Sequence, residues 1–331
     1  MAKPEDITVE DKANQFDRIF ASTDPVEIAN KAIIARYVYA TNILEVEVFD
    51  RFVIPDYVDH DPTPGQEPGL EGLKKAYHTF LEPFPDVLFV FEDIIAEGDL
   101  VFGRGVISGT HQGEFFGIPP TGKRVHWTGT RLFRLEDLMV TEGWINLDFL
   151  GLLQQMGAVP APPAPPPPDT PPPHITGAPA TREETKAIMQ RLVDEFWNEG
   201  NMDVADELFH PQASSPSAPG LPLGPEGVKQ IGQMFRTAFP DYWIRIDLIA
   251  GEDDRVAARF TQGGTHEGDL FGIPPTGKTA EWTEMGILRI ADGKIVESWY
   301  DVDMAGLMQQ LGVGGDGGAE QPVGAEAGAE A

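Results

Sequence analysis

Two side chains in the second half of the chain could carry acid–base chemistry. Glu284 and Tyr300 lie in segments that alternate as β-strands do, and residues two apart on a strand share a face. On a face that lines an apolar cavity, desolvation favours the neutral carboxyl group of Glu284 and makes it a usable general acid. Tyr300 could donate a hydrogen bond to a substrate carbonyl group. The same alternation adds Trp282 and Ser298 as candidate substrate-binding residues.

The first half of the chain offers a different set of candidates. Arg131 and Trp127 lie on the corresponding strand, and the planar guanidinium of an arginine suits carboxylate binding in an apolar cavity. His60 lies in a loop where such a cavity could open, which makes it a third binding candidate. Structural roles are the alternatives. Glu284 or Arg131 could form an ion pair, Tyr300 could belong to the core, and a loop histidine could be solvated.

The elements that position these residues occur twice along the chain. The heptapeptide Gly-Ile-Pro-Pro-Thr-Gly-Lys stands unchanged at 117–123 and 272–278, an offset of 272 − 117 = 155. The same offset relates Phe-Pro-Asp at 84–86 and 239–241, and Gly-Leu-x-Gln-Gln-x-Gly at 151–157 and 306–312. Solenoid repeats run only about 20–50 residues, so this repeat indicates a duplicated domain.

Segments without helix or strand patterns separate and flank the two copies. Residues 1–24 are predicted to be an N-terminal arm and 314–331 a disordered acidic tail. Residues 158–180 are rich in proline and predict a stiff linker that holds two domains apart. Copy one then comprises residues 25–157, and copy two comprises residues 181–313.

Each copy has the periodicity of an α+β domain. Helical spacing dominates its first half, and four strand-like segments and one short helix follow. Helices packed across one face of a curved, four-stranded antiparallel sheet would leave a cone-shaped cavity. The other sheet face is apolar and has nothing left to cover it. We therefore expect either pairing of the two copies within one chain or a homodimer.

The hairpin between the last two strands differs between the copies. Copy two has Asp292-Gly293, a strong signal for a tight turn with positive φ. Copy one has Asp137-Leu138 at this place, and a leucine resists positive φ by roughly 1 kcal/mol. We expect another turn geometry in copy one.

The composition limits the possible partners. Acidic residues number 53 against 24 basic ones, and this formal charge of −29 repels nucleic acid and anionic membranes. The chain has no cysteine and no run of eighteen apolar residues. Disulfides, thiolate metal sites and a membrane span are therefore not expected, and the cytoplasm is the expected location. The acidity fits an ordinary acidic protein or one adapted to high salt.

The repeated motifs resemble those of a known family. Phe-Pro-Asp, Gly-Thr-His, Gly-Ile-Pro-Pro-Thr-Gly-Lys and Gly-Leu-x-Gln-Gln-Leu-Gly look like a SnoaL-like domain, the polyketide or ester cyclase group of the cystatin-like α+β cone fold. The resemblance covers about residues 26–157 and 182–313. It implies ring closure by intramolecular aldol condensation, with one pocket Asp as general acid/base. It also implies that no metal, cofactor or covalent intermediate takes part.

Carried onto this sequence, the pocket positions of the family hold other residues. In copy two, the Asp position falls at Tyr300, the pocket His at Gly286 and the pocket Gln at Glu284. In copy one, the His position holds Arg131 and the Asp position holds Ile145. This register turns the faces with Glu284 and Tyr300 toward the cavity of copy two, so we expect catalysis there.

The expected function is cyclase- or isomerase-type acid–base chemistry, without a metal, on a small apolar carbonyl or ester substrate. Glu284 would be the acid/base and Tyr300 the carbonyl donor. Two other classes of protein remain as alternatives. One is a non-catalytic module that binds apolar small molecules in two cone-shaped pockets, and the other is a purely structural pseudo-dimer.

Overall fold

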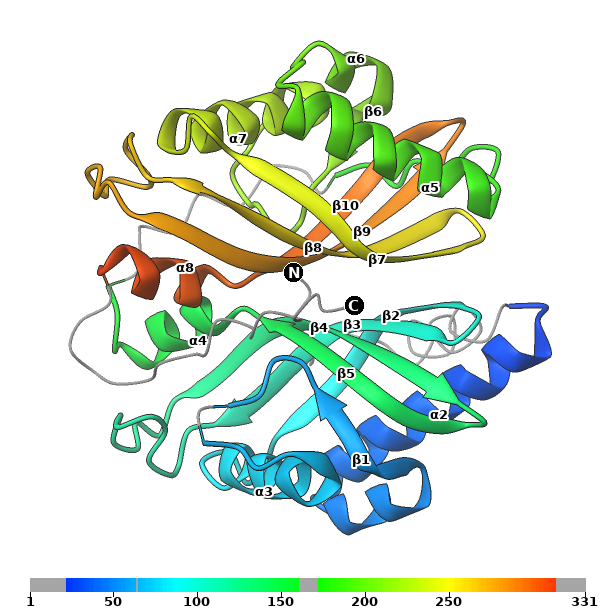
Figure 1. Ribbon diagram of the computed structural model, residues 1–331, viewed down its shortest axis with the longest axis vertical. Coiled ribbons are helices and arrows are strands. Elements are labelled where there is room, and N and C mark those ends of the chain that lie inside the picture. Colours follow the sequence, from blue (N-terminus) through cyan, green and yellow to red (C-terminus); the bar gives the residue numbers. More distant parts are fainter. Residues whose placement is uncertain (1–21, 64, 161–171, 314–331) are drawn as a thin grey trace, which may run out of the picture.

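The chain folds as two similar halves whose sheets face each other. The computed structural model describes residues 22–63, 65–160 and 172–313. The long helices lie on the outer side of both sheets, so that the layers run helix, sheet, sheet, helix (Figure 1). Two short helices, at 149–156 and 304–311, lie instead between the two halves at one edge of the molecule. Within these ranges, no helix is long and apolar enough to cross a membrane. Most of the N-terminal arm predicted for 1–24 and the tail predicted for 314–331 lie outside the described residues.

The helices and strands occur in the same order in both copies. Copy one contains α2 (Pro25–Asn42), the 3-10 helix η2 (Val46–Arg51), β1 (Val53–Asp59), α3 (Gly69–Leu81), β2 (Leu88–Glu97), β3 (Leu100–Thr110), β4 (Arg124–Glu136), β5 (Met139–Leu147) and α4 (Phe149–Met156). Copy two contains α5 (Arg182–Arg191), the π-helix η3 (Leu192–Asn198), α6 (Val204–Leu208), β6 (Phe209–Ser214), α7 (Pro225–Ala238), β7 (Trp243–Glu252), β8 (Arg255–Thr265), β9 (Thr279–Ala291), β10 (Lys294–Val302) and α8 (Met304–Leu311).

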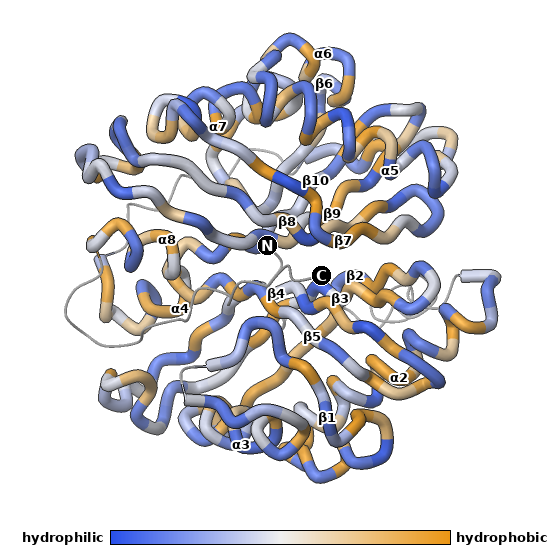
Figure 2. The backbone as a smooth tube through the Cα atoms, viewed as in Figure 1, coloured by the Kyte–Doolittle hydropathy of each residue, from blue (hydrophilic) through white to orange (hydrophobic). Residues whose placement is uncertain are grey.

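Local sequence signals fix where the helices begin. The side chain of Asp24 accepts hydrogen bonds from two backbone N–H groups at the start of α2, and Thr181 and Glu184 form a capping box on α5. Asp148 and Asp303 cap α4 and α8 in the same manner. Figure 2 shows hydrophilic and hydrophobic residues mixed along the outer helices, as expected of helices that bury one side.

Each sheet has five strands, one more than the four predicted. The strand orders are β1-β5-β4-β3-β2 and β6-β10-β9-β8-β7. The additional strands, β1 and β6, are edge strands that pair parallel with β5 and β10. They contain Pro55 and Pro211. A proline cannot donate to the strand ladder, so such strands are confined to edges, and their prolines conceal the strand pattern in the sequence.

The hairpin between β4 and β5 also differs from expectation. Asp137 and Leu138 have φ values of 49° and 62°. The equivalent residues of copy two, Asp292 and Gly293, have φ values of 51° and 73°. Copy one therefore uses the same left-handed turn as copy two, and the prediction of another geometry is wrong. Leu138 is exposed at the turn, so it adopts this conformation against a local strain of only about 1–2 kcal/mol.

The sheet faces turned away from the helices pack against each other. Their shared apolar cluster consists of Ile95, Leu100, Phe102, Leu132 and Trp144 from copy one and Ala250, Ala257, Met285 and Ile287 from copy two. The prediction that the linker holds the domains apart is therefore wrong, because burial of these faces brings the sheets together. Residues 161–171 of the linker lie outside the described residues. Its last part lies against the β9–β10 hairpin, where the N–H of Ala178 donates to Asp292 at 2.9 Å.

Two sets of polar contacts across this interface are related by the 155-residue offset. Lys31 of copy one forms a buried ion pair with Glu252 of copy two. Its equivalent, Lys186, pairs with Glu97 at 2.6 Å. The same two carboxylates accept hydrogen bonds from backbone N–H groups of the opposite copy at 2.7 and 2.8 Å. The two copies are thus related by a pseudo-two-fold axis.

Glu27 and Arg182 mark the position of this axis. Arg182 Nη2 lies 2.9 Å from the buried carboxylate of Glu27. The two residues occupy the same position in their copies, since 182 − 27 = 155. Residues related by a two-fold axis meet only where the axis passes between them, so the axis runs near this ion pair.

Candidate active site

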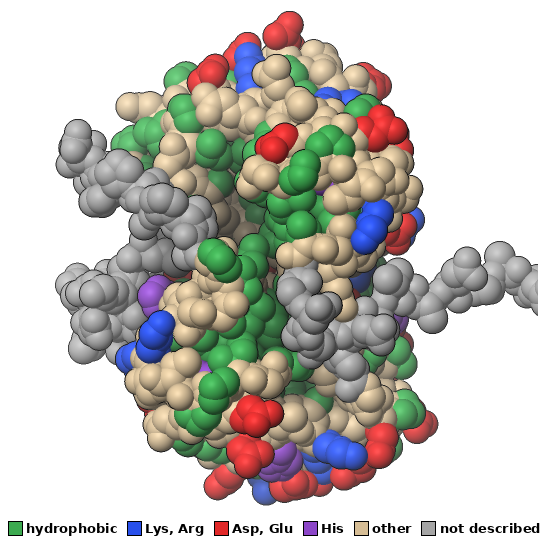
Figure 3. Space-filling model, turned by 90° about the vertical axis from the view of Figure 1, so that its left-hand side faces the viewer, with side chains coloured by type: hydrophobic (Ala, Val, Ile, Leu, Met, Phe, Trp, Pro, Cys, Tyr) green, Lys and Arg blue, Asp and Glu red, His purple; other side chains and the backbone are tan. Residues whose placement is uncertain are grey.

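Both copies contribute to cavities large enough for a small organic molecule. Copy two encloses a cavity of about 590 Å³. A second cavity of about 750 Å³ lies in copy one and extends to residues of copy two. Figure 3 shows the face that carries α4 and α8, with hydrophobic side chains gathered along its middle. Among the described residues, no three His, Asp or Glu side chains converge in a way that could hold a metal ion.

Glu284 lines the cavity of copy two from strand β9. The Nε2 atom of Gln262, on the neighbouring strand β8, donates to Glu284 Oε2 at 2.9 Å. The hydroxyl group of Tyr242 donates in turn to Gln262 Oε1. These two contacts fix the amide of Gln262 and orient the carboxyl group of Glu284. In the part of the chain that the structure describes, Glu284 has no arginine or lysine within ion-pair distance.

Burial changes the acidity of Glu284. Loss of hydration raises its pKa from 4.5 to about 7, against the opposing effect of the hydrogen bond from Gln262. The negative charge of Asp301 adds to the rise. Near neutral pH the carboxyl group is therefore divided between its two protonation forms. That division suits a group that both takes and returns a proton.

Tyr300 and Ser298 line the same cavity from strand β10. Burial raises the pKa of Tyr300, so its phenol group stays protonated and can donate a hydrogen bond. The backbone N–H of Tyr300 donates to Ser217 Oγ at 2.9 Å, which attaches the loop after β6 to the last strand. The structure thus brings three of the predicted residues, Glu284, Ser298 and Tyr300, to one cavity.

The two tryptophans predicted to bind substrate do not line the cavities of their own copies. Trp282 is 2% exposed, and its ring centre lies 6.3 Å from those of Phe235 and Tyr242, which do line the cavity. Trp127 is 1% exposed, and its ring packs against Phe80 in the corresponding place. Strand alternation places both indoles on the expected face, but aromatic rings nearer the cavity cover them.

Arg131 lines the cavity of copy one from strand β4. Its guanidinium carbon lies 5.2 Å from the ring centre of Tyr77 and 6.0 Å from that of Tyr37. Tyr57 lines the same cavity. No carboxylate of the described residues lies within ion-pair distance of Arg131. The predicted cation is therefore present in the cavity, without the ion pair that was the structural alternative.

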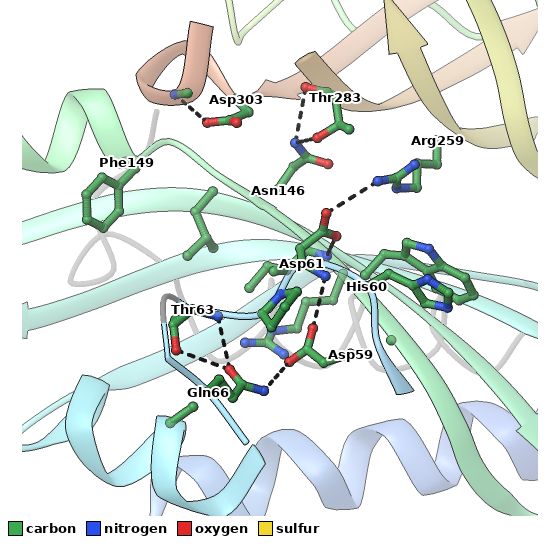
Figure 4. Close-up of a pocket in the computed structure, with 18 of the residues that line it drawn as sticks. Asp59, His60, Asp61, Thr63, Gln66, Asn146, Phe149, Arg259, Thr283 and Asp303 are labelled. Atoms are coloured by element: carbon green, nitrogen blue, oxygen red, sulfur yellow. Dashed lines mark hydrogen bonds and ion pairs between the residues drawn. The ribbon is translucent and has the colours of Figure 1, made fainter. Parts of the chain in front are cut away.

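The loop after β1 forms the mouth of this cavity (Figure 4). His60 stacks on Trp144 with ring centres 4.2 Å apart, and its Nε2 lies 2.7 Å from Glu142 Oε2. Asp61 accepts a hydrogen bond from the backbone N–H of Ile145 at 2.8 Å. This bond repeats the one between Ser217 and Tyr300, at the equivalent position of the last strand. His60 is thus a positioned residue of the mouth and not a freely solvated one.

Copy two completes the mouth of the copy-one cavity. Arg259 Nη2 lies 3.3 Å from Asp61 Oδ1, besides its contact with a carboxylate of its own copy (Figure 4). The equivalent arginine, Arg104, instead lies 3.6 Å from Asp301 across the interface. Copy one has Asn146 at the position of Asp301, since 301 − 146 = 155. The neutral amide of Asn146 cannot form an ion pair with Arg259 as the carboxylate of Asp301 does with Arg104. Arg259 pairs instead with Asp61, in the loop after β1.

Sequence reasoning missed several residues of these sites. Strand alternation could have identified Gln262. It lies two residues from Phe260 on the same face of β8, and Phe260 is directly opposite Glu284 on β9. Tyr242 follows the Phe-Pro-Asp motif directly, and nothing in the sequence indicates that its hydroxyl group reaches Gln262. The contact between Asp61 and Arg259 depends on how the copies pack, which the sequence does not specify.

Comparisons with known proteins find one family in both halves of the chain. The family model described as SnoaL-like polyketide cyclase matches residues 31–156 and 187–311. Nogalonic acid methyl ester cyclase from Streptomyces nogalater is 31% identical over 120 residues, which are 35% of this chain and 89% of that protein. Aklanonic acid methyl ester cyclase DnrD from Streptomyces peucetius is 30% identical over 131 residues, 38% of this chain and 88% of that protein. The structure of TsrD from Streptomyces laurentii shares 28% identity over 40% of this chain and 98% of that chain, with a TM-score of 0.39.

Proposed function

Because the chain belongs to the SnoaL-like polyketide cyclase family, whose model matches more than half of it, we propose that it closes a ring in a small carbonyl or ester compound. Two relatives are named as cyclases of nogalonic and aklanonic acid methyl esters, which supports an apolar ester as substrate. The proposed reaction takes place in the cavity of copy two. Glu284 acts as the acid/base and Tyr300 as the hydrogen-bond donor.

Glu284 performs both proton transfers of the proposed aldol reaction. Its ionised form takes a proton from the carbon next to a substrate carbonyl group, which leaves an enolate. The enolate carbon attacks a second carbonyl carbon of the same molecule, so that one C–C bond forms and the attacked oxygen becomes an alkoxide. Protonated Glu284 returns its proton to that alkoxide. No co-reactant is consumed, and the product has the same mass as the substrate.

Tyr300 and Gln262 support this cycle from neighbouring strands. The neutral phenol group of Tyr300 donates to the oxygen on which negative charge develops, and such a fixed donor stabilises the transition state. Gln262 holds one carboxyl oxygen of Glu284 and leaves the other for the substrate proton. Ser298 lies two residues from Tyr300 on the same face and contributes a further polar contact for the substrate.

The position of Glu284 beside Tyr300 in one apolar cavity, with Gln262 holding one of its carboxyl oxygens, is the observation that carries this proposal, and the raised pKa of Glu284 supports it. Incubation with aklanonic acid methyl ester should yield a product of unchanged mass and altered chromatographic retention. Glu284→Gln should lower turnover by about 10²–10⁴-fold, the usual contribution of general acid–base catalysis. Glu267→Gln, an exposed glutamate of the same copy, is the matched control and should keep full activity. Full activity in Glu284→Gln would exclude this site.

We also propose that the two copies work as one intramolecular pair. The apolar cluster between the sheets and the ion pair of Arg259 with Asp61 support this pairing. Light scattering should then give a mass near the 36.2 kDa of a single chain. A mass near twice that value would favour a homodimer of chains instead.

A further inference from the structure

The cavity of copy one is built for a different ligand chemistry. We propose that it binds an apolar ring compound that carries one carboxylate group, with Arg131 as the residue that holds the carboxylate. This inference goes beyond the proposed ring closure, because it concerns the other cavity and a binding step without chemistry. It rests on the charge of Arg131, on the state of the acids around it and on the apolar wall.

Among the described residues, no carboxylate forms an ion pair with Arg131. A guanidinium stays protonated at every pH at which proteins fold. Placing such a charge among apolar groups is unfavourable unless an opposite charge lies beside it. Asp59 is the carboxylate whose charge acts on Arg131, but it forms no ion pair with it. The oxygens of Asp59 instead accept hydrogen bonds from Gln66 Nε2 at 2.9 Å and from the N–H of Asp61 at 3.2 Å.

Three other acids near this cavity have partners elsewhere, and a fourth, Glu281, is an exposed residue of copy two. Asp61 pairs with Arg259 of copy two. Glu142, which does not line the cavity, pairs with Arg134 at 2.8 Å. Asp303 caps α8. Each of these carboxylates is held away from Arg131, so the inner end of the cavity stays positive until an anion enters.

The rest of the wall selects an apolar molecule. The tyrosine rings beside Arg131 attract its positive charge through their faces, which holds the guanidinium in place but leaves its N–H donors unused. The apolar side chains of the wall include Leu73, Ala76, Phe80, Ile107, Ile145 and Leu147. A volume of about 750 Å³ has room for several fused rings. The planar fork of an arginine matches the two oxygens of a carboxylate.

Copy two cannot bind an anion in this manner. Gly286 stands where copy one has Arg131, since 286 − 131 = 155. Glu284, which lines the cavity of copy two, would repel a carboxylate whenever it is ionised. A preference for an acid over its neutral ester is therefore a property of copy one alone.

The test compares 2-anthroate with methyl 2-anthroate, two fluorescent molecules of nearly the same shape. Titrated into the full chain at fixed ionic strength, the acid should bind at least about tenfold more tightly than the ester, as expected for charge-assisted hydrogen bonds. Arg131→Met should abolish this preference and leave the affinity for the ester nearly unchanged. Arg131→Lys should keep part of it, because an ammonium retains the charge but not the planar fork.

Two controls separate this inference from the proposed function. Arg124→Gln removes one exposed positive charge from the same strand and should keep the preference for the acid. Glu284→Gln should also keep the preference for the acid, even though the same variant is expected to lose ring closure. Equal affinity for acid and ester in the unaltered protein would overturn the inference. A preference that persists in a folded Arg131→Met variant would overturn it as well.

Discussion

The ring of Tyr300 lies over Gly286, where a Cβ atom would stand only 2.7 Å from Tyr300 Cδ1. These residues face each other across β9 and β10. At the equivalent pair of copy one, Arg131 faces Ile145. In each copy one long polar side chain fills this space. In copy two it is Tyr300, from the last strand β10, and in copy one it is Arg131, from the preceding strand β4. The two cavities therefore present a proton donor in one case and a cation in the other.

Adding one methyl group under Tyr300 should impair catalysis without altering any polar group. In Gly286→Ala the new Cβ must displace the Tyr300 ring, and misplacement of a catalytic group by about 1 Å can cost about 10²-fold. We expect kcat to fall by about tenfold or more, with KM less affected. Gly129→Ala is the matched control, because its Cβ meets Leu147 in copy one, away from the proposed chemistry. An unchanged kcat in Gly286→Ala would show that the position of Tyr300 does not matter.

Glu284 should make the stability of the protein depend on pH. Burial raises its pKa in the folded state to about 7 from the ordinary 4.5, so the folded state binds more protons between these values. Stability is then lost as the pH rises through this window, and it levels off above about pH 7. At about 1.4 kcal/mol for each pKa unit, the loss is on the order of 3 kcal/mol.

Glu284→Gln removes this loss, because an amide has no proton to release. Relative to the unaltered protein, the variant should gain stability between about pH 4.5 and pH 7 in urea denaturation, and the gain should level off above this window. Glu267→Gln supplies the baseline for the loss of an exposed carboxylate. A stability difference that stays flat across this range would mean that Glu284 is not desolvated.

The left-handed turn at Leu138 offers a stabilising substitution. Glycine adopts positive φ without the steric penalty that a side chain brings, so Leu138→Gly should raise the free energy of unfolding by about 1 kcal/mol. The reverse change in copy two, Gly293→Leu, should lower it by a similar amount. Chemical denaturation measures both. Destabilisation by Leu138→Gly would indicate that the exposed leucine makes contacts that outweigh the strain.

The formal charge of −29 should make stability rise with ionic strength. Screening weakens the repulsion among carboxylates, and the screening length falls from about 30 Å at 0.01 M salt to about 3 Å at 1 M. The thermal midpoint should therefore rise in potassium chloride, with most of the gain below 1 M. A flat or falling midpoint would argue against repulsion as a destabilising force.

Much of the fold follows from short-range signals in the sequence. The caps at Asp24, Thr181, Asp148 and Asp303 lie where side-chain oxygens meet free N–H groups, and such contacts need no knowledge of distant residues. The four antiparallel strands of each copy follow from alternation. Alternation does not predict the fifth strands, β1 and β6, because they are short and each contains a proline.

Only part of each candidate site could be predicted from the sequence. Alternation and repeat register bring Glu284 and Tyr300 to one face, and both line the cavity of copy two. The depth of Trp282 below that cavity depends on which rings pack in front of it. The ion pair of Arg259 with Asp61 joins residues 198 positions apart through the packing of the two copies. No local pattern encodes such a contact.

The ion pair between Glu27 and Arg182 bears on the ancestry of the chain. In an isologous dimer a residue on the two-fold axis meets itself, and a charged residue there would face its own charge. Two separate copies of the first domain would bring Glu27 against Glu27, and two of the second would bring Arg182 against Arg182. Fusion of the duplicated gene removed the requirement for self-complementarity. The interface now contains an ion pair that neither half could form with its own twin.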